Sequence, residues 1–130
     1  MLKLHVLDDL WQHSGKVAHG VEVPAGTRLL FTNGQVGTRP DGITPESTID
    51  QTAVVFDRLR AILLASNMKF EDVVRLNIYL TEQSDVEDVL KIRDQNMGDH
   101  KPAATILVVN GLARPGLKVE IEAVAARISD

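Results

Sequence analysis

Two stretches of the chain repeat apolar residues every three or four positions, as amphipathic helices do. The first helix is predicted from Thr48 to about Ser66, and Asn67 is suited to a left-handed residue that ends it. The second is predicted from Ser84 to about Met97, because Ser84 and Glu87 have the spacing of a capping box. The apolar face of the first helix comprises Ile49, Ala53, Phe56, Leu59 and Leu63.

Alternation with a period of two predicts strands elsewhere in the chain. The predicted strands cover residues 3–7, 17–23, 28–37, 74–80, 103–109 and 117–125. Residues 38–47 are rich in Pro, Gly and Asp, which predicts an exposed loop. The element order is then three strands, a helix, a strand, a helix and two strands. Since each helix follows a strand, both can lie on one face of a single sheet, and the other face stays uncovered.

The last predicted strand places two carboxylates on one of its faces. Its odd positions from Leu117 to Ala125 are apolar and suit the helix side, so Glu120 and Glu122 point the other way. That uncovered face continues with apolar residues, and faces of this mixed kind are usually covered by another copy of the same chain. We therefore expect a homo-oligomer with both glutamates in or beside its interface. The residues expected to share this face are Ile106, Val108, Val124 and Ala126.

Composition narrows the class of protein. The 130 residues suit a single domain spanning positions 1–130, and the net charge of −4 gives no general attraction to nucleic acid or anionic membranes. Cysteine is absent, which excludes disulfides and thiolate chemistry. The beginning of the chain lacks the apolar core of a signal peptide, and no apolar run approaches the ~20 residues of a membrane helix. We expect a soluble, cytoplasmic protein.

Two groups of residues are candidates for chemistry. The segment NGQVG, residues 33–37, is either a plain turn or a source of backbone N–H groups for a carboxylate or oxyanion. The pair Glu120 and Glu122 supplies either an acid or base with a raised pKa, or an inter-subunit salt bridge. The four histidines lack metal-ligand spacing, so no metal site is predicted.

Taken together, NGQVG, QTAVVFDRLRAILLASNMKFEDVVRLNIYL, KPAATILVV and LKVEIEAVA resemble the Rid family, also called the YjgF family. The resemblance runs from about residue 14 to residue 127. It implies an α+β fold like that of chorismate mutase, with a mixed sheet and two helices on one face. It also implies a homotrimer with small-molecule clefts between subunits. The family's RidA branch hydrolyses enamines and imines such as 2-aminoacrylate to 2-keto acids and ammonia, without a cofactor.

The resemblance assigns roles to particular positions of this chain. It implies that Glu120 positions or activates water and that the N–H of Gly34 faces the substrate carboxylate. The arginine that clamps this carboxylate in the family is replaced by Ala104, and a tyrosine and a small hydroxyl residue are replaced by Val17 and Asn33. The predicted substrate contacts are Gly34, Asn33, Val17, Ala104 and Ile106.

Losing the arginine removes a strong, bidentate carboxylate anchor. The cleft then suits a larger or uncharged substrate, unless Arg39 or Arg114 reaches in from a loop. We expect a Rid-like deaminase or hydrolase with Glu120 as its catalytic residue; the alternative is a non-catalytic trimer that binds a small molecule. The acidic balance and the lack of a basic, aromatic surface pattern argue against the ribonuclease implied by an older family name, "endoribonuclease L-PSP".

Overall fold

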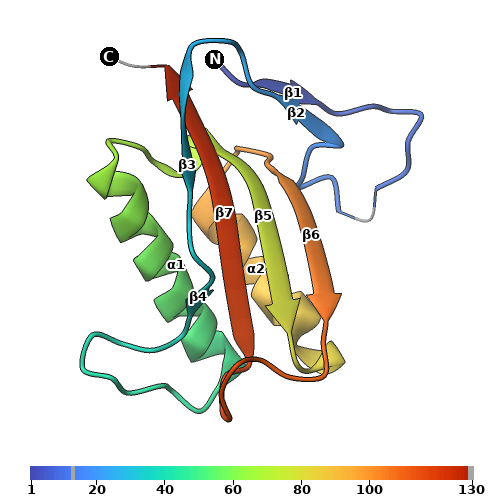
Figure 1. Ribbon diagram of the computed structural model, residues 1–130. Helices are drawn as coiled ribbons and strands as arrows, with labels where there is room; N and C mark the ends of the chain where they lie inside the picture. The colour runs from blue at the N-terminus through green and yellow to red at the C-terminus, as the bar shows by residue number, and fades with distance from the viewer. Residues whose placement is uncertain (13, 129–130) are drawn as a thin grey trace.

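The computed structural model describes residues 1–12 and 14–128 of the chain (Figure 1). A five-stranded mixed sheet has the order β3–β7–β5–β6, with the short β4 also paired to β7. β5 and β6 are parallel, and the other strand pairs described in this sheet are antiparallel. Helices α1 and α2 both lie behind this sheet in Figure 1, so its front face is uncovered within the chain. The sheet strands are β3 (Thr27–Phe31), β4 (Gln35–Val36), β5 (Val73–Leu80), β6 (Ala103–Val108) and β7 (Val119–Ile128), and the helices are α1 (Thr48–Ala65) and α2 (Val86–Met97).

The two N-terminal strands stand apart from that sheet. β1 (Lys3–His5) and β2 (Gly20–Glu22) pair with each other as an antiparallel ribbon, which corrects the expectation of a single sheet. The ribbon reaches the sheet through the N–H of Ala18, which donates to the carbonyl of Pro102, just before β6. The predicted strand 28–37 is also divided, because the chain leaves strand geometry between β3 and β4.

Helix α1 begins and ends as predicted, but its buried face differs. Ser47 caps its first turn by accepting from the N–H of Asp50, and Asn67 after it has a positive φ of 55°. Ile49 is 48% exposed, whereas Gln51 and Thr52 are fully buried. Burial of these two polar residues is possible because both side chains bond to backbone groups.

Helix α2 lacks the predicted capping box. Ser84 lies inside the 3₁₀ turn η2 (Gln83–Asp85), and Asp85 is the N-cap residue without a side-chain capping bond. The Asp85 carboxylate instead accepts from the hydroxyl of Thr48, at 2.6 Å. That bond ties the beginning of α2 to the beginning of α1, which sequence spacing within one helix does not reveal.

The core fills the space between the helices and the rear face of the sheet. β7 contributes Val119, Ile121, Ala123 and Ala125, each no more than 4% exposed, which confirms the predicted alternation. α1, β5 and α2 supply the other large side chains, including Phe56, Leu59, Leu63, Leu76, Ile78, Leu80 and Val89. None of the described helices is long and apolar enough to cross a membrane.

Gln51 connects α1 to the segment that leads into β7. Its amide donates to the carbonyls of Pro45 at 2.9 Å and Gly116 at 2.8 Å, and it accepts from the N–H of Lys118 at 2.8 Å. A Cβ built on Gly37 would lie 2.5 Å from the Cβ of Gln51, so β4 also packs closely on this residue. The Gln51 side chain thus contacts both strands of the pair that carries Glu120, at the end where β4 finishes and β7 begins.

We predict that Gln51→Leu lowers the free energy of unfolding by about 3 kcal/mol, because it leaves one buried and two partly buried backbone groups without their partner while nearly keeping the side-chain volume. Chemical denaturation at one fixed protein concentration measures this loss. Gln95→Leu, at an exposed position of α2, is the matched control and should change the value by less than about 0.5 kcal/mol. Equal losses in the two variants would contradict the role given to Gln51.

Candidate functional site

The register of β7 places both glutamates on the uncovered face. Glu120 lies between Val36 of β4 and Tyr79 of β5, and Glu122 lies opposite Asn77. The partners of these β5 residues on β6 are Leu107 and Thr105. Side chains of paired residues lie on the same face of a sheet. On the uncovered face they therefore form rows across the strands: Val36, Glu120, Tyr79 and Leu107 make one row, and Glu122, Asn77 and Thr105 make the next.

The register of β6 corrects the expectation for Ile106 and Val108. Ile106 pairs with the fully buried Ile78 and packs against the core, so it faces the helices. Val108 pairs with the buried Leu80 and has the same orientation, although it is 42% exposed near the strand end. β6 is apolar on both faces, so periodicity could not show which of its residues point to the helices.

Glu120 lies directly against the backbone of Gly34. A Cβ built on Gly34 would overlap the Oε2 atom of Glu120 and lie 2.9 Å from its Cδ, so only glycine leaves room for this carboxylate. The Glu120 side chain is half-buried and accepts no hydrogen bond from any side chain or N–H of the described residues. It is therefore a carboxylate held in place by packing, with its oxygens available to a ligand or water.

Glu122, unlike Glu120, accepts hydrogen bonds from side chains of the same chain. Its Oε1 accepts from the amide Nδ2 of Asn77 and from the hydroxyl of Tyr79, each at 3.1 Å. Both of these partners are neutral, so an inter-subunit salt bridge to Glu122 stays a prediction. The hydrogen bond to Glu122 raises the pKa of Tyr79 above its ordinary value, helped by desolvation and by the negative charges of both glutamates.

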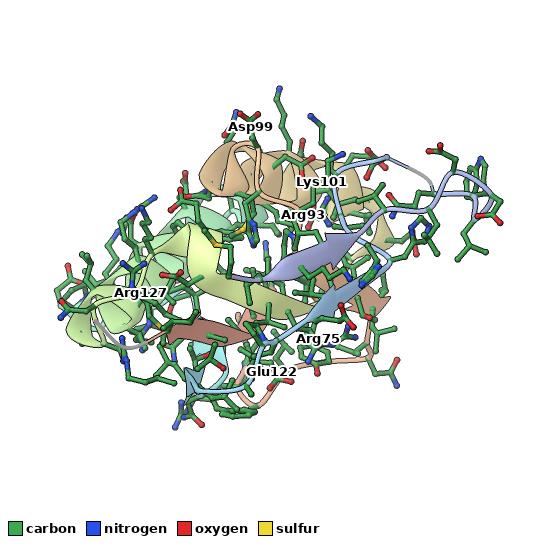
Figure 2. The ribbon with its side chains drawn as sticks, turned by 90° about the horizontal axis from the view of Figure 1, so that it is seen from above. Arg75, Arg93, Asp99, Lys101, Glu122 and Arg127 are labelled. Carbon is green, nitrogen blue, oxygen red and sulfur yellow. The ribbon has the colours of Figure 1, made fainter. Side chains whose placement is uncertain are left out.

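Arg75 completes the polar part of this face. Its guanidinium donates to the hydroxyl of Thr105 at 2.6 Å and partly offsets the rise in the Tyr79 pKa. Figure 2 shows Arg75 and Glu122 on the side of the sheet away from α2. The sequence analysis missed Arg75, Asn77 and Tyr79, yet the signal was present: the alternation that buries Leu76, Ile78 and Leu80 leaves these polar residues on the other face.

The remaining predicted residues fall into two groups. Asn33 adjoins Gly34 in the connection between β3 and β4, so it belongs with Glu120. Val17 immediately precedes Ala18, whose N–H bonds to Pro102, and so lies near the beginning of β6. Ala104 pairs with the buried Leu76 and faces the helices, as Ile106 does. One chain therefore does not bring Ala104 and Ile106 to the face that carries Glu120, and β5 separates the β6 region near Val17 from β7.

Two surface hollows lie elsewhere. One, of about 430 Å³, is lined by residues such as Leu4, His100 and Arg127. The other, of about 440 Å³, lies beside α2 and is lined by residues that include Arg93. Neither includes Glu120 or Gly34. Glu120 thus lies on an open sheet face in the single chain, so enclosing a ligand there requires another surface.

The chain has one tyrosine, so its titration can be followed directly. We predict that Glu122→Gln lowers the pKa of Tyr79, because the carboxylate both accepts the phenol proton and repels the phenolate. A raised folded-state pKa stabilises the native state below the unfolded-state pKa, and this contribution disappears as pH rises through the folded-state pKa. The absorbance of the phenolate, recorded against pH, measures the shift. Glu46→Gln, at an exposed position, should leave the titration unchanged, and an unchanged titration in Glu122→Gln would contradict the assignment.

Comparison with known proteins shows relatives that cover most of the chain. Protein DfrA of Myxococcus xanthus is 33% identical over 113 residues, which are 85% of each chain. TdcF of Escherichia coli, which carries the provisional name reactive intermediate deaminase, is 26% identical over 87% of this chain and 88% of its own. A crystal structure of YyfB from Yersinia pestis, described as a Rid-family protein of unknown function, matches with a TM-score of 0.86. That match has 26% identity and covers 97% of this chain and 98% of YyfB.

The family model described as endoribonuclease L-PSP matches residues 15–127, nearly the whole sheet and both helices. The mixed sheet with two helices on one face, predicted from the resemblance, agrees with the structures of Rid and YjgF proteins. These matches show that the chain belongs to the Rid (YjgF) family.

Proposed function

We propose that the protein hydrolyses small imines or enamines to a carbonyl compound and ammonia, with Glu120 activating the attacking water. The observation that carries this proposal is the half-buried Glu120 carboxylate, which lies against Gly34 without a hydrogen-bond partner among the described residues. A carboxylate in this position can accept the proton of a water molecule as its oxygen attacks the imine carbon. The relative TdcF supports the reaction class through its provisional name.

The reaction requires two proton movements. Water attacks the C=N carbon, a C–O bond forms, and Glu120 takes the water proton. The protonated Glu120 then returns this proton to nitrogen, which gives a neutral amino alcohol. Its hydroxyl proton also passes to nitrogen, by way of solvent, as the C=O bond forms and the C–N bond breaks to release ammonia. The N–H of Gly34 supplies a possible backbone donor for a developing negative charge or a polar substrate group beside Glu120.

We also propose that the catalytic cleft forms between copies in a homotrimer. The predicted contacts divide into one group around Gly34 and Glu120 and another around Val17, Ala104 and Ile106, so a second copy is needed to bring both groups together. Large apolar side chains on the uncovered face support its coverage by such a copy. These side chains are Leu29, Phe31 and Leu107, with exposures of 55%, 68% and 50%.

A non-catalytic small-molecule-binding trimer is the second candidate function. The observation that favours it is Ala104, which provides no charged group where the family resemblance implies a carboxylate clamp. A crystal structure of TdcF contains bound serine, so a relative of similar fold holds a small amino acid. Ligand binding without acceleration of any imine hydrolysis would support this candidate over the enzyme.

We predict that Glu120→Gln lowers kcat for imine hydrolysis by about 10²-fold or more, because glutamine cannot accept the water proton. The assay uses an amino-acid oxidase to generate imino acids and semicarbazide to trap those that survive. Sedimentation analysis should show the same trimer in wild type and variant. Glu122→Gln, the same change two residues along the same face, should keep kcat within about threefold, since Glu122 is occupied by Asn77 and Tyr79. Wild-type turnover in Glu120→Gln would remove Glu120 from the mechanism.

We predict that Gly34→Ala also lowers kcat by about 10²-fold, because the added methyl group displaces the Glu120 carboxylate. Gly111→Ala is the matched control, since a Cβ at that position meets no atom within 4 Å. Steady-state kinetics and sedimentation on both variants separate loss of activity from loss of assembly. An assembled Gly34→Ala variant with normal kcat would show that the position of the Glu120 carboxylate is not essential.

A further inference from the structure

We infer that Arg58 of α1 is a positioning residue for the proposed hydrolysis and acts through Gln35 on the N–H of Gly34. This inference rests on the proposed function and deepens it, because it names a side chain on a helix that orients and polarises a backbone donor beside Glu120. It comes from three hydrogen bonds that link α1 to the segment from Asn33 to Thr38.

The guanidinium of Arg58 holds this segment at two points. Its Nε donates to the Oε1 atom of Gln35 at 3.0 Å, and its Nη1 donates to the carbonyl of Thr38 at 2.9 Å. Figure 1 shows β4, which begins at Gln35, beside α1. Gln35 is only 6% exposed, so its amide oxygen needs a donor from the protein, and Arg58 supplies it.

The Gln35 side chain in turn bonds to the peptide group that contains the Gly34 N–H. Its Nε2 donates to the carbonyl of Asn33 at 3.0 Å. This carbonyl and the Gly34 N–H belong to one planar trans peptide group, so they point in opposite directions and turn together. Holding the Asn33 carbonyl therefore fixes the direction of the Gly34 N–H. That N–H donates to no group within the part of the chain that the structure describes, so a ligand can accept from it.

Gly34 needs this restraint because glycine has the greatest backbone freedom of any residue. A side chain cannot replace that freedom, since a Cβ at this position would overlap the Glu120 carboxylate. The chain is fixed to β7 on both sides of Gly34, by hydrogen bonds of Thr32 and by the pairing of β4. Among the described residues, the bond from the Gln35 side chain restrains the Asn33–Gly34 peptide group that lies between these two points.

The same bonds transmit the positive charge of Arg58. The guanidinium polarises the Gln35 amide, which makes its Nε2–H a stronger donor to the Asn33 carbonyl. That stronger bond polarises the next peptide group and makes the Gly34 N–H more positive. The ion pairs among the described residues do not involve Arg58, so none of them neutralises its charge. A more positive N–H binds a negative or polar group of the reacting substrate more strongly.

A double-variant cycle tests whether Arg58 acts through Gln35. Arg58→Gln should lower kcat/KM about tenfold for the imino acid that wild type hydrolyses fastest, which is less than the roughly 10²–10³-fold loss of kcat expected from removing such a donor outright. Gln35→Met nearly keeps the side-chain volume and should lower kcat/KM at least as much. If the hydrogen bonds act in series, the double variant should match Gln35→Met within about twofold. Losses that multiply in the double variant would overturn the inference.

Arg60→Gln is the matched control. It makes the same change two residues along α1, where the guanidinium bonds instead to Asp57 and Asn96. The control should keep kcat/KM within about twofold of wild type. Chemical denaturation and sedimentation of the same samples separate lost activity from lost stability or assembly. Equal losses of kcat/KM in Arg58→Gln and Arg60→Gln would overturn the inference.

Arg58→Lys provides a test that does not depend on a variant of the buried Gln35. Lysine keeps the charge and can donate to the Gln35 Oε1 atom, so kcat/KM should be at least about threefold higher than in Arg58→Gln. No recovery with lysine, or wild-type kcat/KM in Arg58→Gln, would overturn the inference and leave the proposed hydrolysis intact. If wild type hydrolyses no imino acid faster than buffer does, the proposed function fails, and this inference fails with it.

Discussion

The structure depends on the pairing of β7 between β4 and β5. This strand alternates strictly, so burying Val119, Ile121, Ala123 and Ala125 under the helices forces Glu120 and Glu122 onto the opposite face. A slip of one residue would exchange the two sets and place two carboxylates in the core, at a prohibitive cost in desolvation. The hydrophobic core therefore determines the orientation of the Glu120 carboxylate, although Glu120 itself contributes little to the core.

Patterns with one dominant local cause were predicted well. The strand order around the two helices, the left-handed Asn67 and the alternation of β7 follow from neighbouring residues in the sequence. Features with long-range causes were missed. The face of β6 depends on its parallel register with β5, and the beginning of α2 depends on a bond between Thr48 and Asp85, 37 residues apart.

The residues of the candidate site also differ in whether the sequence predicted them. Gly34 and Glu120 were predicted from short motifs and the family resemblance, and the structure brings them into contact. The Tyr79–Glu122–Asn77 arrangement was missed because each residue alone looks like an ordinary polar position on a strand. Only the register reveals that two adjacent glutamates have different surroundings: one is held by hydrogen bonds, and the other is left with free oxygens.

Ala104 occupies the position that the family resemblance gives to the carboxylate clamp. Its side chain faces the helices and packs against the core, next to the partner strand's Leu76. An arginine at this position would have to run its aliphatic stem along that apolar surface and carry its guanidinium out past the edge strand β6. Without a bound anion, such a cation has no partner to offset its loss of hydration. Alanine removes this cost, and the burial of Val119 and Ile121 keeps Glu120 in place regardless. The packing that orients Glu120 is therefore independent of the side chain at position 104.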